Sequence, residues 1–164
     1  MSEAFEQSKK LIILTILYNL VEGIFALYFG LESNSTSLLS FGLDSFIEIT
    51  ASGIALWGVT SKKETSHTQA EKLIAYSFLL LIVFILTKSS FDLININKPE
   101  TSFYGVILGV VSILVEGPLA YRKLKLGRLL NNNLLIAEAK ETLFCLNLSV
   151  LVIIGVGVNY LFGL

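Results

Sequence analysis

Long apolar stretches alternate with short polar ones along almost the whole chain. An α-helix needs about 20 apolar residues to cross the ~30 Å hydrocarbon core of a bilayer at ~1.5 Å per residue. The stretches that approach or exceed this length are residues 11–30, 37–60, 72–94, 103–121 and 134–162. The pattern therefore predicts an all-α fold, a polytopic bundle of transmembrane helices that forms one domain over residues 1–164.

Short polar connections separate these stretches, at residues 31–36, 61–71, 95–102 and 122–133. If the spans alternate in direction, nearly all basic residues fall on the side of the N-terminus. They are Lys9, Lys10, Lys62, Lys63, Lys72, Arg122, Lys123, Lys125 and Arg128, whereas Lys98 falls on the opposite side. Cytoplasmic loops carry an excess of lysine and arginine. We therefore expect an integral, multi-pass membrane protein with its N-terminus in the cytoplasm.

The composition agrees with a membrane location and excludes several function classes. Hydrophobic residues make up 54% of the 164 residues, and the mean hydropathy is +0.74, which is more apolar than a water-soluble domain requires. A net charge of -1 gives no basic surface for a nucleic acid. The single cysteine, Cys145, excludes an intramolecular disulfide. No pair of nucleophile and base accompanies the carboxylates, so we expect no enzyme activity.

Carboxylates interrupt the apolar stretches at Glu22, Asp44, Glu48, Glu116, Glu138 and Glu141. A charge at the centre of a bilayer costs about 2.5–3.5 kcal/mol on insertion scales, and such residues usually face a bundle interior or a water-filled path. The alternative is purely structural. Protonated carboxyl groups would then join helices through hydrogen bonds in lipid, and Cys145 would pack as a small apolar residue.

The spacing of these residues favours a metal site. Asp44 and Glu48 lie four residues apart on one face of a helix, and Glu141 and Cys145 repeat that spacing. Counting ~1.5 Å per residue from the helix ends, we expect Asp44 at the depth of Cys145 and Glu48 at the depth of Glu141. Carboxylates favour Mn²⁺, and a thiolate favours Zn²⁺, Cd²⁺ or Fe²⁺. Protons compete with a metal for such ligands, as an exchanger requires.

A short internal repeat supports a transporter fold. Residues Leu20–Gly23 and Leu114–Gly117 both read Leu-Val-Glu-Gly, and a carboxylate of the next span follows each of them at a similar distance. The two halves would cross the membrane in opposite senses, as in the inverted repeats of secondary transporters. Three spans per half then predict a sixth span, which would lie beyond residue 164.

Three further carboxylates and two glycines complete the candidate residues. We expect Glu22 and Glu116 to serve hydration or the passage of protons, and Glu138 to act as an accessory group one turn before Glu141. Gly105 and Gly109 form a small-xxx-small pattern that favours close helix packing, for example at a dimer contact.

At residues 37–48 and 136–145 the sequence resembles the cation diffusion facilitator family of divalent-metal exporters. That family carries a small-Asp-small-x-His/Asp-x-x-x-Asp pattern in its second and fifth spans. The metal ligands that the resemblance implies are Asp44, Glu48, Glu141 and Cys145. The resemblance also implies a homodimer, because members often dimerise through a C-terminal domain that would follow the sixth span.

The sequence departs from the family pattern at two ligands and one loop. Glu141 stands where the family has His, and Cys145 stands where it has Asp. The usual preference for zinc therefore does not carry over, and Zn²⁺, Fe²⁺, Mn²⁺ and Cd²⁺ all stay open as the transported cation. The His-rich loop between the fourth and fifth spans is replaced by residues 122–133.

Two functions follow from these observations. The first is a secondary transporter that exports a divalent transition-metal cation in exchange for protons. The second is a non-transporting membrane scaffold or subunit that has kept the fold with an altered metal site. The substituted ligand Cys145, and Lys140 beside Glu141, motivate this alternative.

Overall fold

The computed structural model describes residues 2–60, 64–94 and 103–162, and these residues form α-helices and no strand. The helices are α1 (Ser2–Glu32), α2 (Thr36–Thr60), α3 (Glu64–Ile94), α4 (Phe103–Leu129) and α5 (Asn133–Phe162). Each predicted apolar stretch lies within one of them, so the predicted all-α bundle is confirmed. The predicted orientation in the membrane rests in part on Lys62, Lys63 and Lys98. These three residues lie outside the described residues.

The fourth helix is longer than its apolar stretch predicts. We expected a polar connection over residues 122–133, whereas α4 continues to Leu129 and residues 130–132 separate it from α5. The added turns consist mainly of lysine, arginine and leucine, which are strong helix formers. The expectation of a loop was wrong because these basic residues continue the helix, with Arg122 exposed at its surface and Lys123 buried in the core.

The turns of the α1–α2 and α4–α5 hairpins are built alike. Asn34 and Asn131 take positive φ values of 48° and 49°, a conformation that asparagine tolerates better than most residues. The amide of the next residue then donates to the carbonyl five residues earlier, over 3.0 Å in the first turn and 2.9 Å in the second. These are the contacts of a Schellman motif, which ends a helix cleanly.

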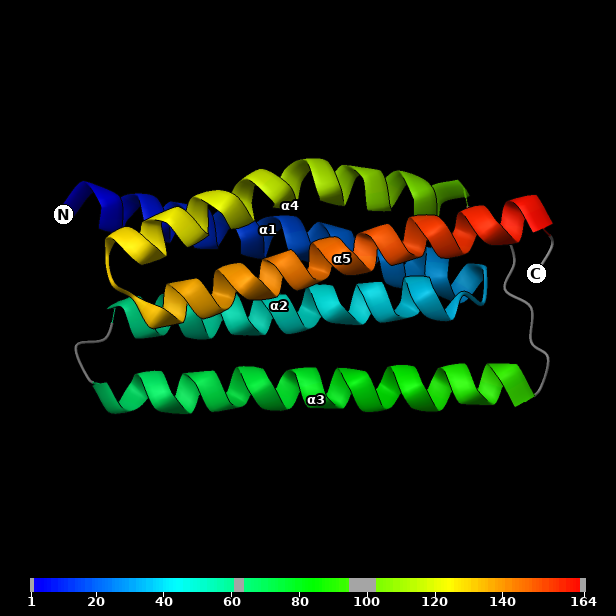
Figure 1. Ribbon diagram of the computed structural model, residues 1–164, viewed down its shortest axis with the longest axis horizontal. Coiled ribbons are helices and arrows are strands. Elements are labelled where there is room, and N and C mark those ends of the chain that lie inside the picture. Colours follow the sequence, from blue (N-terminus) through cyan, green and yellow to red (C-terminus); the bar gives the residue numbers. More distant parts are fainter. Residues whose placement is uncertain (1, 61–63, 95–102, 163–164) are drawn as a thin grey trace.

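The two hairpins point in opposite directions. Their turns lie at opposite ends of the bundle, and α1, α2, α4 and α5 pack together while α3 lies to one side against α2 (Figure 1). A similar hairpin thus occurs twice with reversed sense, which is the arrangement that the internal repeat predicts. The shared core of these four helices is where the candidate residues meet.

Gly109 packs within the chain. A Cβ atom at this position would lie 2.8 Å from Cγ1 of Ile153 and 3.1 Å from the backbone oxygen of Ser149, both on α5. Gly105, one turn earlier, is also buried. The small-xxx-small pattern therefore brings α4 close to α5, so it forms a contact between two helices of the same chain.

The bundle has an apolar outer face, and its core contains both polar and apolar side chains. Three described helical segments are long and apolar enough to cross a membrane, namely Glu3–Glu32, Thr36–Gly58 and Phe103–Leu129, and Ala75–Phe91 forms a shorter apolar segment. Large apolar side chains are exposed along their outer faces, such as Leu17 and Leu114 at 57% and 68%. Buried serines, threonines and carboxylates share the core with two apolar clusters, one that includes Ile12 and Leu134 and one that includes Leu38 and Phe41. This distribution is that of an integral, multi-pass membrane protein.

Candidate metal centre

All seven predicted site residues lie in the core that α1, α2, α4 and α5 share. Each is at most 3% exposed. They come from four helices: Glu22 from α1, Asp44 and Glu48 from α2, Glu116 from α4, and Glu138, Glu141 and Cys145 from α5. The helical spacing explains this convergence, because residues three, four and seven positions apart share one face of a helix.

The antiparallel register of α2 and α5 places the paired residues at the same level. Ser52 of α2 donates a hydrogen bond of 2.8 Å to Oε1 of Glu138. One turn further along, Thr142 donates to Oε1 of Glu48. Cys145, nearly one turn beyond Thr142, interacts with the carboxyl group of Asp44. The two helices therefore face each other in the register that the depth argument predicts.

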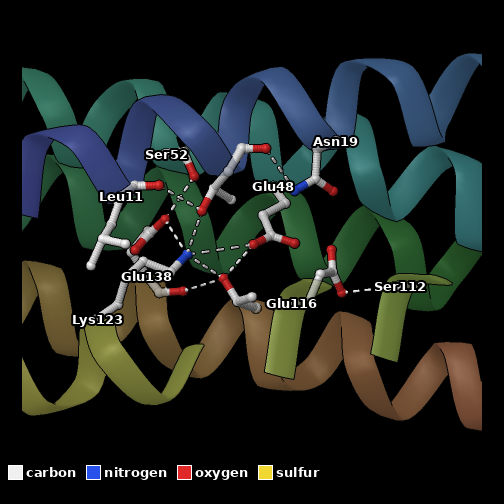
Figure 2. Close-up of polar contacts among 10 residues, drawn as sticks. Leu11, Asn19, Glu48, Ser52, Ser112, Glu116, Lys123 and Glu138 are labelled. Carbon is white, nitrogen blue, oxygen red and sulfur yellow. Dashed lines mark hydrogen bonds and ion pairs between the residues drawn. The ribbon is translucent and has the colours of Figure 1, made fainter. Parts of the chain in front are cut away.

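Lys123 of α4 is an unforeseen member of this core. Its side chain is 0% exposed, and its Nζ atom donates to Oε1 of Glu138 at 2.7 Å, to Thr142 Oγ1 at 2.5 Å and to Thr15 Oγ1 at 3.1 Å. Oε1 of Glu48 lies 3.8 Å from the same nitrogen. Figure 2 shows the ammonium pointing in among these oxygens. A buried charge needs such partners.

A sequence signal for this role existed. Lys123 lies seven residues after Glu116, so both project from the same face of α4. We call the group around the ammonium the lysine cluster. Its members are Thr15, Glu48, Ser52, Lys123, Glu138 and Thr142.

A second group holds carboxylates and a thiol without a positive side chain. One ligand atom from each of Glu22, Glu116 and Cys145 lies within 4.8 Å of the other two. Asp44 interacts with this cysteine from α2. We call Glu22, Asp44, Glu116 and Cys145 the acid cluster.

Hydroxyl groups are the donors to the acid cluster. Tyr18 and Ser45 donate to the two oxygens of Glu22 over 2.7 and 3.1 Å. Ser112 donates to Oε2 of Glu116 over 3.0 Å and accepts a 2.8 Å hydrogen bond from Ser149. Each of these contacts satisfies one oxygen and adds no charge.

Several buried oxygens have no hydrogen-bond partner among the described residues. They are the amide oxygen Asn19 Oδ1 and the carboxylate oxygens Asp44 Oδ1, Glu48 Oε2, Glu116 Oε1, Glu138 Oε2 and both of Glu141. Buried polar atoms are rarely left without a partner, and such atoms in a native fold point to a ligand or a proton. Carboxylate oxygens beside a thiol are a donor set that divalent transition metals accept.

The structure separates Lys140 from the site. Lys140 is exposed, whereas its neighbour Glu141, about 100° further round α5, is 3% exposed. It is therefore not placed to neutralise the candidate ligands. The buried positive charge comes from Lys123.

Comparison with known protein families adds an independent finding. The model of the cation efflux transmembrane domain matches residues 12–163. That segment contains both clusters and nearly all of the five helices. Comparisons with curated proteins and with solved structures gave no match.

Proposed function

This chain belongs to the cation efflux family, and from that premise we propose that its cargo is a divalent transition-metal cation bound by Asp44, Glu48, Glu141 and Cys145. The family transports cations across membranes and is not a class of enzymes. The observation that carries the proposal is the group of unpartnered carboxylate oxygens on the facing sides of α2 and α5. A divalent cation would satisfy these oxygens and offset their mutual repulsion.

The chemistry of the proposed ligands limits which cations fit the site but does not identify a single one. Three carboxylates favour hard ions such as Mn²⁺, and a thiolate favours Zn²⁺, Fe²⁺ or Cd²⁺. The lack of a histidine in the core removes the ligand that most often favours Zn²⁺, Cu²⁺ and Ni²⁺ over harder ions. We propose Zn²⁺, Fe²⁺, Mn²⁺ and Cd²⁺ as the cations to compare in one assay.

Exchange for protons follows from the ligands. A carboxyl group or thiol must lose its proton before it binds a metal, so each binding event releases protons. The affinity should therefore rise as the pH rises. Glu22, Glu116 and Glu138 extend the line of acidic groups on both sides of the proposed ligands, and we assign them to the path of protons and cations.

Transport by the reconstituted chain tests the site. We expect the Asp44→Ala and Glu141→Ala variants in proteoliposomes to lose metal flux, measured with an entrapped metal-sensitive dye. Lys140→Ala is the matched control, because Lys140 neighbours Glu141 and is exposed. Full flux in both ligand variants would refute the proposed site. Simultaneous recording with a pH dye tests proton exchange, since the proton signal should disappear together with the flux.

The second candidate is a membrane scaffold that binds no metal. The observation that favours it is Lys123, because this ammonium already neutralises part of the acidic charge that a metal would compensate. Calorimetry of the purified chain with each of the four cations separates the two functions. A transporter requires saturable binding that weakens in Glu48→Gln and Glu141→Gln, whereas a scaffold shows none.

Orientation and assembly complete the proposal. We place the N-terminus in the cytoplasm and the active form in a homodimer. Labelling of a cysteine introduced at Ser2 of a Cys145→Ser background, in intact cells and in inverted vesicles, tests the first point. Sedimentation in detergent tests the second, and a monomer that transports metal would refute it.

A further inference from the structure

A cleft with basic and apolar walls lies between α1 and α4, outside both buried clusters. It forms where α1 begins and α4 ends, and its volume is about 630 Å³. The lining residues are Gln7, Lys10, Leu11, Leu14, Arg122, Lys125, Leu126 and Leu129. No carboxylate is among them.

The positive charges of this cleft have no negative partner among the described residues. Lys10, Arg122 and Lys125 are exposed, and none of them makes an ion pair or hydrogen bond with a described residue. Lys9, the neighbour of Lys10, is by contrast paired with Glu6 over 3.0 Å. Three uncompensated cations around one concavity produce a local positive potential that attracts an anion.

The apolar walls decide which anion fits. Leu14 and Leu129 are 50% and 70% exposed, and Leu11 and Leu126 also line the cleft. A free phosphate ion would gain nothing from four leucines. A phospholipid would place its phosphate at the basic groups and its acyl chains against the leucines. Basic pockets between transmembrane helices bind anionic headgroups in this manner.

We propose that this cleft binds an anionic phospholipid of the surrounding bilayer. The guanidinium group of Arg122 can hold two phosphate oxygens at once, and Lys10 and Lys125 add charge from opposite walls. Lys123 lies next to Arg122 in the sequence but points into the core, where it reaches Thr15 of α1 over 3.1 Å. A lipid in the cleft would therefore hold together the same two helices that the buried ammonium connects.

Native mass spectrometry of the purified full chain tests the proposal. The chain is released from micelles containing equal amounts of phosphatidylglycerol and phosphatidylcholine, and the retained lipid is counted. We expect wild type to retain phosphatidylglycerol preferentially. The Arg122→Gln/Lys125→Gln variant should bind it about thirtyfold more weakly, the factor expected for two charges removed near a membrane surface.

The matched control is Lys72→Gln/Arg128→Gln, which removes two exposed charges that do not line the cleft. It should retain the lipid like wild type. Equal loss in the control, or no preference for phosphatidylglycerol in wild type, would overturn the proposal. Displacement of the lipid by millimolar glycerol phosphate would also overturn it, because the cleft would then bind a free anion. Circular dichroism of each variant confirms that it is folded.

Discussion

The lysine cluster and the acid cluster share one core but neutralise their carboxylates in different ways. In the lysine cluster the ammonium of Lys123 lies 2.7 Å from Glu138 and 3.8 Å from Glu48. In the acid cluster Glu22 and Glu116 receive hydrogen bonds from neutral side chains, mainly hydroxyl groups. The first cluster carries its own cation, whereas the second must obtain a cation or protons from outside. The proposed ligands Asp44 and Cys145 belong to the acid cluster, whereas the proposed ligand Glu48 also lies beside the ammonium of Lys123.

The largest expected effect comes from removing the built-in cation. Lys123→Met keeps the length of the side chain but leaves Glu48 and Glu138 buried without a positive partner. Breaking a buried ion pair from one side costs about 3–5 kcal/mol, so the free energy of unfolding in detergent micelles should fall by that amount. The exposed Lys140→Met is the matched control and should change it by less than about 0.5 kcal/mol.

A double variant sharpens this test. Lys123→Met/Glu138→Gln removes one of the two carboxylate charges that Lys123→Met leaves without a positive partner, and it keeps an acceptor for the Ser52 hydroxyl. We expect it to recover much of the lost stability. Equal stability of wild type and Lys123→Met would contradict the burial of the ammonium and abolish the difference between the two clusters.

The second-largest expected effect is the stabilisation of the folded chain by an added metal ion. A cation that binds the folded state at 100 times its dissociation constant stabilises that state by about 2.7 kcal/mol. We expect Cd²⁺ to raise the thermal midpoint of wild type and of Lys140→Met, and a chelator to reverse the shift. Asp44→Asn should lose the shift. The shift should also shrink as the pH falls, because protons compete for the same oxygens. A shift retained in Asp44→Asn would remove this residue from the site.

Most of the fold was predictable because a helix that crosses a membrane requires a long apolar stretch, which can be recognised in the sequence. Every helix contains a stretch of apolar residues long enough to be found by eye, and the four-residue spacing of Asp44 and Glu48 defines one buried face. The register of α2 against α5 was predictable as well. It follows from helix rise and the positions of the two helix ends, both of which can be counted.

Hydropathy alone does not predict the role of Lys123, although its seven-residue spacing from Glu116 places both residues on one face of α4. Hydropathy treats it like Arg122 and Lys125, because all three lie in a basic run at the end of an apolar stretch. What distinguishes it is a carboxylate on another helix, Glu138, fifteen residues later in the sequence. Close contacts of Cys145 with Glu22 and Glu116 were missed for the same reason, since the spacing within one helix says nothing about its partners on α1 and α4.

The smallest expected effect probes the hydroxyl groups of the acid cluster. Tyr18→Phe removes the 2.7 Å hydrogen bond to Oε1 of Glu22 and leaves the Ser45 bond to the other oxygen. Losing one such bond should reduce the free energy of unfolding by about 1 kcal/mol. Tyr121→Phe is the control, because Tyr121 is 68% exposed. Added Cd²⁺ should stabilise Tyr18→Phe as much as wild type, since the removed hydroxyl is not a proposed ligand. If the free energy of unfolding instead fell by several kcal/mol, the Tyr18 hydroxyl would contribute as much to stability in the acid cluster as the Lys123 ammonium does in the lysine cluster.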